Sequence, residues 1–395
     1  MTYDAIVIGL GAMGSAALYQ LAKRGARVLG IDRFHPPHDR GSSTGHTRIT
    51  RLAVGEGAEY VPLVRRSHEI WREIEAQLDG ALRVRPGTEL MLTCGGLVIG
   101  PRSGGGELHG AGNFVLRTIA VAREQGIAHE ALDADTVCER FPQFVLRGDE
   151  IACFEPGAGV LRPERCIAAQ LELAKRTGAQ VLLGEVVTAI SGTGSGVAVT
   201  SGGVTHHAAR AIQSAGAWNP ALATGRFATE LRVRRQTLHW FRAVDSQAMR
   251  AYAPDTCPIF IWSHGATPDD AFYGISAADE HRAVKVGTQQ HMVDTEPDTL
   301  NREVTQAESE AVHRRHVQGR LGGLSAQRVH AAACLYTVAQ DARFVIDRHP
   351  RVEHALVVSA CSGHGFKHSA AIGEAAAHWV LGTRSEIDLG QFAWR

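Results

Sequence analysis

The chain opens with a strand, loop, helix and second strand whose glycine spacing restricts it to one kind of unit. The apolar run 5–8 leads directly into residues 9–14 (GLGAMG), a helical stretch covers 15–24, and the apolar run 27–31 ends in Asp32. The glycines allow a tight turn close to a pyrophosphate, and the helix N-terminus faces that anion. Asp32 stands where a ribose hydroxyl is bound. Because all the parts follow in order, the unit predicts binding of an adenine dinucleotide.

Length and composition limit the class of protein. The 395 residues suffice for two domains, and 41 Lys plus Arg balance 41 Asp plus Glu, so no net field favours nucleic acid or an anionic membrane. No apolar run is long enough to cross a bilayer, and an acid, Asp4, stands where a signal peptide has basic residues. Seven scattered cysteines without a C-x-x-C pair fit a reducing compartment. We therefore expect a cytoplasmic protein that binds neither nucleic acid nor membranes.

The order of the predicted elements indicates an α/β (α+β) fold. A Rossmann-like dinucleotide-binding domain, discontinuous in sequence, is expected over residues 1–85, 151–219 and 325–395. An inserted, mainly antiparallel β domain is expected over 86–150 and 220–324, because it holds most of the remaining strand-like runs. Pockets favour the seam between two domains, so we expect the site there.

Three further elements are predicted from local patterns. Residues 90–92 and 97–99 are predicted to form a hairpin, and helices are predicted over 301–320 and 366–381. Histidine pairs at 206–207 and at 313 and 316 have no third ligand nearby, and the second pair is predicted to face solvent. No metal site is therefore expected.

The C-terminal region carries a second glycine turn. The apolar strand 356–360 is followed by residues 361–367 (CSGHGFK), at the start of the last predicted helix. The turn and the helix N-terminus bring backbone N–H groups to one spot, and Lys367 adds a positive charge. Such a spot suits either the anionic edge of a reduced flavin or a substrate carboxylate.

Several motifs spread over nearly the whole chain point to one family. They are the glycine unit, residues 45–51 (GHTRITR), 55–63 (GEGAEYVPL), 154–156 (FEP), 216–219 (GAWN), 334–337 (CLYT) and 362–367 (SGHGFK). On these the chain resembles the monomeric sarcosine oxidases and N-methyltryptophan oxidases, flavoproteins of the glycine-oxidase/D-amino-acid-oxidase fold group. The resemblance implies FAD rather than NAD and an inserted domain that binds substrate.

The resemblance also implies roles for individual residues. Cys334 matches the cysteine bonded to the 8α-methyl of the flavin, which requires a thiolate. Arg51 and Lys367 match the pair that holds the substrate carboxylate, and Arg48 matches a second arginine close to the flavin. Lys285 matches the lysine that reaches flavin N5 through water and activates oxygen, and Tyr273 matches a tyrosine of the substrate pocket.

The full set of residues expected to bind FAD combines the glycine unit with the family motifs. It comprises Gly9, Gly11, Ala12, Met13, Gly14, Asp32, Arg33, Ser42, Thr44, Thr47, Arg48, Val187, Gly216, Trp218, Cys334, Thr337, Gly363, His364, Gly365 and Lys367.

The chain departs from the family at three places that we expect to concern substrate recognition. Gln289 stands where sarcosine oxidases have an active-site histidine, with His291 nearby. The loop 263–270 is longer than expected, and Ile261 stands near a pocket position usually held by methionine. Sarcosine itself is therefore one of several candidate substrates.

The sequence as a whole predicts an FAD-dependent oxidase, monomeric like its family, that takes a secondary amino acid and oxygen and releases hydrogen peroxide. Alternatives with related chemistry are an amine dehydrogenase that passes electrons to a carrier, and an oxidase of cyclic imino acids or glycated amino acids. A flavoprotein that modifies RNA conflicts with the balanced charge. An NAD-dependent dehydrogenase would leave Cys334 and the turn 363–367 unexplained.

Overall fold

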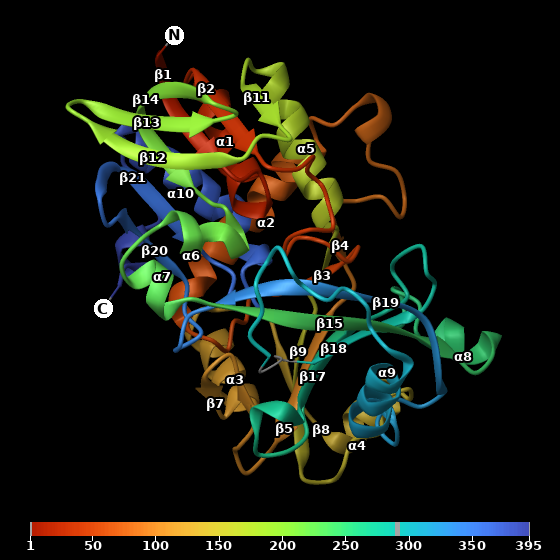
Figure 1. The fold of residues 1–395 in the computed structure, drawn as a ribbon. Coiled ribbons are helices and arrows are strands. Elements are labelled where there is room, and N and C mark those ends of the chain that lie inside the picture. The colour runs from red at the N-terminus through yellow and green to blue at the C-terminus, as the bar shows by residue number, and fades with distance from the viewer. Residues whose placement is uncertain (1, 289–292, 395) are drawn as a thin grey trace.

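A computed structural model describes residues 2–288 and 293–394, and two eight-stranded sheets organise them (Figure 1). The first sheet, in the upper part of the figure, has the order β11-β2-β1-β14-β13-β12, with β21 beside β14 and β20 beside β21. Its strands are β1 (Thr2–Ile8), β2 (Val28–Asp32), β11 (Gln180–Leu183), β12 (Val187–Thr193), β13 (Gly196–Ser201), β14 (Val204–Gln213), β20 (Val345–His349) and β21 (Val352–Ser359).

Parallel pairing at the centre of this sheet confirms the predicted strand, helix and strand of the N-terminal unit. β1 pairs in parallel with both β2 and β14, and its residues Ala5 to Ile8 are buried. Helix α1 (Ala12–Lys23) packs between α5 (Pro163–Arg176) and α10 (Ser369–Leu381), and α10 also contacts α2 (Val61–Glu75). Gly373 allows the close approach of α10, because a Cβ there would lie 2.4 Å from that of Ala16.

The second sheet fills the lower part of the molecule (Figure 1) and has the order β19-β15-β18-β17-β16-β5-β9-β8. An aromatic core that includes Phe241, Phe260, Trp262 and Phe272 lies against it. Its strands are β5 (Gly96–Pro101), β8 (Glu130–Asp133), β9 (Glu150–Glu155), β15 (Arg232–Ala243), β16 (Ile259–Ser263), β17 (Ala271–Ile275), β18 (Val284–Thr288) and β19 (Leu324–Val338).

Short elements cover this sheet and join the two halves. Helices α3 (Phe114–Glu124), α4 (Ala134–Arg140), α8 (Ser246–Ala251) and α9 (Gln306–Val312) contact the second sheet. A small sheet of β3 (Arg48–Thr50), β10 (Gly159–Leu161) and β4 (Met91–Thr93) carries the arginine segment, and α6 (Asn219–Leu222) and α7 (Arg226–Glu230) follow β14. A two-stranded ribbon pairs β6 (Glu107–Leu108) with β7 (Ala111–Gly112).

The predicted fold class is confirmed, whereas several local predictions change. The hairpin of 90–92 with 97–99 is wrong, because β4 pairs with β10 and β5 pairs with β16 and β9. The helix predicted from 301 begins only at Gln306, where Thr305 caps it. β9 and β19 pair within the second sheet, although residues 151–155 and 325–338 were predicted to belong to the dinucleotide-binding domain.

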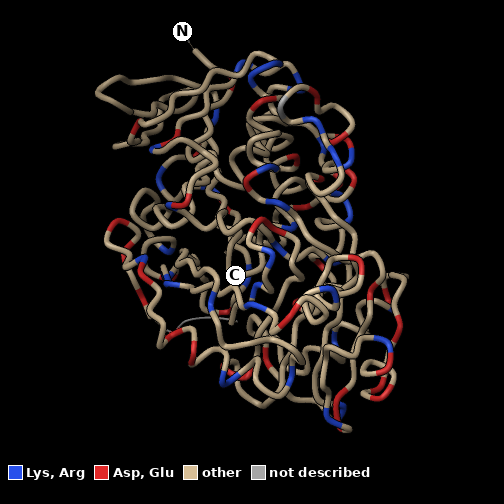
Figure 2. Tube along the Cα trace, turned by 90° about the vertical axis from the view of Figure 1, so that its right-hand side faces the viewer, with Lys and Arg blue, Asp and Glu red and all other residues tan. Residues whose placement is uncertain are grey.

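Charged residues of both signs are spread along the chain, in keeping with the balanced composition. Basic and acidic residues are intermixed along the trace in Figure 2. None of the helices in the described residues is long and apolar enough to span a membrane.

Candidate active site

Two cavities open at the carboxyl end of the first sheet. The glycine cavity, of about 1180 Å³, is lined by Gly9, Gly11, Asp32 and Trp218 among others. The charged cavity, of about 1140 Å³, is lined by Arg51, Glu56, His109 and Lys367 among others. They share walls at Ala12, Ser42, Ser43, Ser214 and Gly216, so one elongated ligand can occupy both.

The glycine turn after β1 requires glycine at two of its three positions. Gly9 has a left-handed φ of +82°, and a Cβ there would lie 2.7 Å from the Ser214 carbonyl oxygen. A Cβ at Gly14 would lie 1.7 Å from the Gly9 carbonyl oxygen. At Gly11 the nearest atom is the Ser43 hydroxyl at 3.7 Å, so this position leaves backbone open to the cavity at the N-terminus of α1. The turn thus forms the cradle expected for a pyrophosphate.

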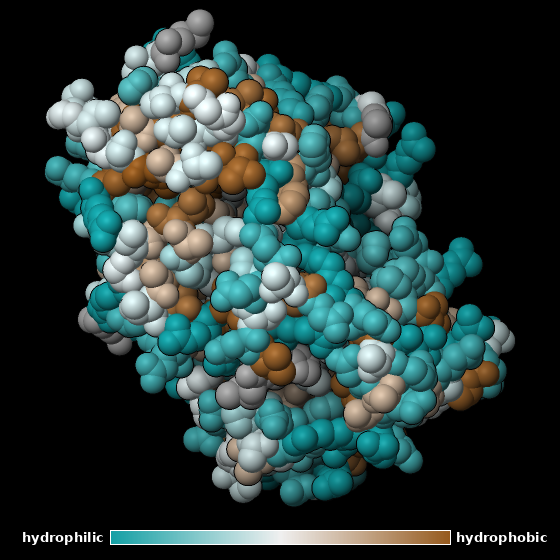
Figure 3. All heavy atoms as spheres, in the orientation of Figure 1, coloured by the Kyte–Doolittle hydropathy of each residue, from teal (hydrophilic) through white to brown (hydrophobic). Residues whose placement is uncertain are grey.

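Asp32 lies at the end of β2 with its carboxylate in the wall of the glycine cavity. Its two oxygens accept hydrogen bonds from the backbone N–H groups of Leu10 at 2.6 Å and Phe34 at 2.7 Å. Burial raises the pKa of this carboxyl, and the two N–H donors oppose that shift. A band of hydrophobic residues crosses the upper left of the molecular face in Figure 3, in the area of β12 and α6. Val186, Val187 and Leu222 line the glycine cavity, and apolar side chains of this kind suit an adenine ring.

Most residues expected to bind FAD line one cavity or both. In the glycine cavity are Gly9, Gly11, Ala12, Asp32, Arg33, Ser42, Val187, Gly216 and Trp218, and in the charged cavity are Ala12, Met13, Ser42, Thr47, Arg48, Gly216, Thr337, Gly363, His364, Gly365 and Lys367. Gly14, Thr44 and Cys334 lie outside both walls. The buried Thr337 hydroxyl has no hydrogen-bond partner among the described residues, as expected for a group that binds a ligand. The donors and the shape of the joined cavities therefore fit FAD.

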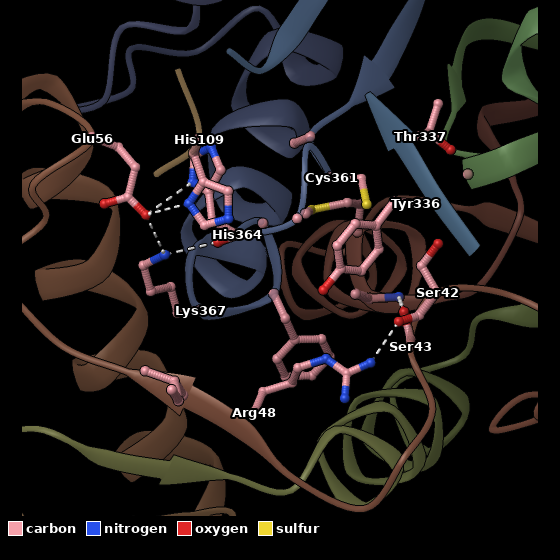
Figure 4. Close-up of a pocket in the computed structure, with 18 of the residues that line it drawn as sticks. Ser42, Ser43, Arg48, Glu56, His109, Tyr336, Thr337, Cys361, His364 and Lys367 are labelled. Carbon is pink, nitrogen blue, oxygen red and sulfur yellow. Dashed lines mark hydrogen bonds and ion pairs between the residues drawn. The ribbon is translucent and has the colours of Figure 1, made fainter. Parts of the chain in front are cut away.

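A buried carboxylate, Glu56, occupies the charged end of this cavity (Figure 4). Its oxygens lie 2.7 Å from Arg51 Nη2, 3.1 Å from His109 Nδ1 and 3.9 Å from Lys367 Nζ. Burial alone would raise the pKa of Glu56, but Arg51 and Lys367 hold it well below its usual range. Arg51 and Lys367 were predicted as site residues, whereas Glu56 and His109 were not.

Lys367 joins the glycine turn to this charge cluster. Its ammonium donates a hydrogen bond to the His364 carbonyl at 2.9 Å and points toward Glu56 in Figure 4. Burial lowers the pKa of Lys367 to about 7, although Glu56 opposes the shift. Gly365 is required in the turn, because a Cβ there would lie 1.7 Å from the Ala360 carbonyl oxygen.

Arg48 and two tyrosines form another wall. The Arg48 guanidinium donates to the carbonyls of Ser42 at 2.7 Å and Thr47 at 2.8 Å. Tyr273 on β17 and Tyr336 on β19 hydrogen-bond to each other and lie near Arg48. Gly287 on β18 makes room for Tyr273, since a Cβ there would lie 2.4 Å from its ring. Tyr336 lies within the 334–337 motif but was not predicted as a site residue.

Lys285 lies behind the cavity wall rather than in it. Its buried ammonium donates to the carbonyls of Gly45 and Thr47, both at 2.8 Å, and lies 5.3 Å from the centre of the Trp240 ring. Burial, followed by the charge of Arg48, lowers the pKa of Lys285 to about 7. Thr47 itself lines the charged cavity, so Lys285 is separated from it by one backbone segment.

Of the described residues that we expect to determine substrate recognition, only some lie at the charged cavity. Ile261 lines the charged cavity. The loop 263–270 does not, and its His264 instead contacts His316 at 3.0 Å between ring nitrogens. His316 is buried, so the prediction that it faces solvent is wrong. Gln289 and His291 lie outside the described residues.

The relationships to known proteins agree with this geometry. Residues 4–379 match the family described as DAO, FAD dependent oxidoreductase. The monomeric sarcosine oxidase of Streptomyces avermitilis is 36% identical over 394 residues, which cover 99% of this chain and 97% of that protein. The N-methyl-L-tryptophan oxidase of Salmonella arizonae is 33% identical over 399 residues, covering 99% of this chain and 98% of that protein.

Solved structures share the fold at lower identity. NikD, described as an unusual amino acid oxidase essential for nikkomycin biosynthesis, superposes with a TM-score of 0.80 at 22% identity, covering 99% of this chain and 97% of that chain. Glycine oxidase from Geobacillus kaustophilus superposes with a TM-score of 0.74 at 18% identity, covering 100% of this chain and 98% of that chain. The family match over nearly the whole length, together with the glycine cradle and the joined cavities, shows that this chain belongs to the FAD-dependent oxidoreductase family.

Proposed function

We propose that this chain is an FAD-dependent oxidase of N-substituted α-amino acids, which oxidises the C–N bond and reduces oxygen to hydrogen peroxide. The observation that carries the proposal is the charged end of the cavity, where Arg51 and Lys367 surround one carboxylate. A guanidinium fork beside a lysine point charge suits a substrate carboxylate. Relatives named for sarcosine and N-methyl-L-tryptophan support the substrate class, since both names denote N-methylated amino acids.

Substrate binding at this end must compete with Glu56. A substrate carboxylate can replace Glu56 as the hydrogen-bond partner of Arg51. The buried positive charges of Arg51 and Lys367 then still have a negative group beside them. A charge-assisted hydrogen bond of this kind contributes about 1.5–3 kcal/mol. The anchored carboxylate fixes the position of the neighbouring C–H and nitrogen, which lowers the entropic part of the barrier.

Bound FAD supplies the acceptor for the hydride equivalent from the C–H beside nitrogen, and water then hydrolyses the imine product. Met13, Thr337 and His364 are the side chains of this chain that would hold the flavin half in the charged cavity. Tyr273, Ile261 and Leu108 form the less polar wall that shields the reacting atoms from water. No protein base is required when the amine binds unprotonated.

We assign the oxygen step to Lys285. Its buried ammonium is the cation that lies behind Thr47, and a positive charge favours the formation of superoxide. A dehydrogenase that passes electrons to a carrier is the second candidate, because Lys285 is hydrogen-bonded to backbone carbonyls and does not line the cavity.

We further propose that the flavin is covalently bound through Cys334. Burial raises the pKa of this thiol, whereas nearby cations, first Arg48 and then Lys285, lower it and favour the thiolate that attachment requires. Cys361 is a second candidate, because it lines the charged cavity (Figure 4). Acid precipitation should leave the yellow colour in the pellet of the wild type and of Cys361→Ser. Colour that is retained by Cys334→Ser and lost by Cys361→Ser would assign the link to Cys361 instead.

The experiment that tests the main proposal is a panel of amines assayed for both peroxide and dye reduction. We expect peroxide with N-methyl amino acids, cyclic imino acids or glycated amino acids, and none with the corresponding amines that lack a carboxylate. Dye reduction without peroxide would favour the dehydrogenase. Equal activity with and without the carboxylate would contradict the role of Arg51 and Lys367.

We propose a cytoplasmic monomer. The seven cysteines are all free in the structure, which suits a reducing compartment. Light scattering on the purified protein gives the oligomeric state directly.

A further inference from the structure

Three histidines from distant parts of the sequence meet behind the charged cavity. His46 lies in the segment before β3, His281 in the turn before β18, and His330 on β19. One ring nitrogen of each lies within 4.8 Å of the others, and this is the one group of potential metal ligands found among residues 2–288 and 293–394. We propose that these histidines form a binding site for a divalent transition metal of the zinc class.

The histidine rings lie close together and leave an imidazole nitrogen without a partner in the part of the chain that the structure describes. The His281 ring lies 4.3 Å from that of His330 and 5.0 Å from that of His46, measured between ring centres. The buried His281 Nε2 has no hydrogen-bond partner among the described residues, although such atoms are usually satisfied. All three residues are half-buried, so an ion can reach them from solvent.

The distances are compatible with a bound ion after a small rearrangement. Zinc takes imidazole nitrogens at 2.0–2.1 Å, which places three of them about 3.3 Å apart around a tetrahedral ion. Because the His281 and His330 rings are stacked at 16°, one of them must rotate to direct its nitrogen toward the ion. Three protein ligands would leave a fourth position for water.

The surroundings hold the three elements in place. His46 has a left-handed φ of 65°, and its backbone N–H donates to Glu164 at 3.0 Å. Asp279 accepts hydrogen bonds from the His281 backbone N–H at 3.1 Å and from Trp240 Nε1 at 2.7 Å. The exposed Glu280 carboxylate lies 3.8 Å from His46 Nδ1, beyond hydrogen-bond distance.

The type of ligand indicates which class of metal the cluster would bind. Neutral imidazoles are preferred by zinc, copper and nickel over magnesium or calcium.

The site is distinct from the charged cavity but adjacent to the Lys285 segment. None of the three histidines lines either cavity. His46 is the residue between Gly45 and Thr47, whose carbonyls accept from Lys285, and Trp240 contacts both Lys285 and the histidine rings. A bound ion would therefore fix the segment that holds Lys285.

The test uses the FAD-containing enzyme, treated with a chelator and then dialysed against micromolar Zn²⁺ with measurement of bound metal. We expect about one equivalent of zinc in the wild type. His281→Asn, His330→Asn and His46→Asn should each weaken binding at least about tenfold, since even outer-shell changes weaken metal sites by that factor. Asparagine tolerates the left-handed backbone at position 46.

The matched control is His207→Asn, an exposed histidine on β14 outside the cluster, which should bind zinc like the wild type. The flavin spectrum of each variant verifies that it is folded. Wild-type protein that takes up no zinc, or uptake that all three cluster variants retain, for example through the free cysteines, would overturn the proposal. Should one variant fail to fold, the other two still decide the question.

Discussion

The glycine cavity and the charged cavity share a wall but are built in different ways. The first takes its glycine turn and Asp32 from one continuous unit, β1 to β2, and is completed by residues of 33–43, 185–187 and 214–222, which add a second acidic residue, Glu185. The second draws on segments near residues 12, 48, 56, 109, 273, 336 and 364, and buries several ionisable groups together. The glycine turn and its acid are therefore encoded locally, whereas the charged cavity depends entirely on how distant segments meet.

A substitution in the glycine unit should have the most severe consequence. We expect Gly14→Val to abolish flavin binding, because even its Cβ would lie 1.7 Å from the Gly9 carbonyl and the backbone cannot move away within α1. The ratio of flavin to protein absorbance in the purified protein measures this. Gly192→Ala is the control, since a Cβ there meets no atom within 4 Å. Normal flavin content in Gly14→Val would show that the turn tolerates rearrangement.

In the charged cavity the largest effect is expected at Arg51. Arg51→Ala should raise the substrate KM at least about tenfold, since the lost charge-assisted bond is worth roughly 1.5–3 kcal/mol. Arg51→Lys, which keeps the charge without the fork, should be intermediate. The control is the exposed Arg65→Ala on α2. An unchanged KM in Arg51→Ala would remove this residue from substrate binding, while flavin content shows whether the glycine cavity is unaffected.

The same contrast explains what the sequence could and could not predict. The strands, Asp32 and the required glycines followed from spacing alone, because one βαβ unit fixes their geometry. Arg51 and Tyr273 followed only from the family resemblance, whereas Lys367 also followed from its place in the glycine turn at the start of the last helix. Glu56 lies in the quoted 55–63 motif, where a carboxylate between two glycines was the available signal, whereas His109 lies on a short ribbon without any pattern.

The errors have a similar cause. The hairpin of 90–92 with 97–99 was predicted from closeness in sequence, but both strands find partners far along the chain, β10 and β16. His316 was predicted to be exposed from its charged neighbours. It is buried because His264, from the loop 263–270, covers it. Tertiary pairing overrides local pattern at each of these positions.

Substitution of Lys285 tests whether a positive charge behind the wall of the charged cavity contributes to the reaction with oxygen. Lys285→Met should slow flavin reoxidation by about tenfold, or about 1.4 kcal/mol of barrier, and leave flavin reduction much less affected. Stopped-flow measurement of the two half-reactions separates them. Lys175→Met, an exposed lysine on α5, is the control. Equal slowing of both half-reactions would show that Lys285 acts on the structure of the segment 45–47 rather than on oxygen.

The smallest effect expected is a pH dependence at Lys367. Because burial lowers its pKa to about 7, the free enzyme loses this charge as pH rises through neutrality. The kcat/KM of the wild type divided by that of Lys367→Gln should therefore fall between about pH 6 and about pH 9, and the division cancels the ionisation of the substrate.

The lowered pKa of Lys367 also determines whether the free energy of unfolding rises or falls with pH. An unfolded lysine keeps its proton up to about pH 10.4, so between about pH 7 and that value the unfolded chain binds more protons than the folded one. The free energy of unfolding of the wild type relative to Lys367→Gln should therefore rise with pH over this window and level off below it. The ratio of kcat/KM could stay constant with pH while the difference in unfolding free energy changes with pH. That result would mean that Lys367 loses its proton as described but does not anchor the substrate. The charged end would then depend on Arg51 alone.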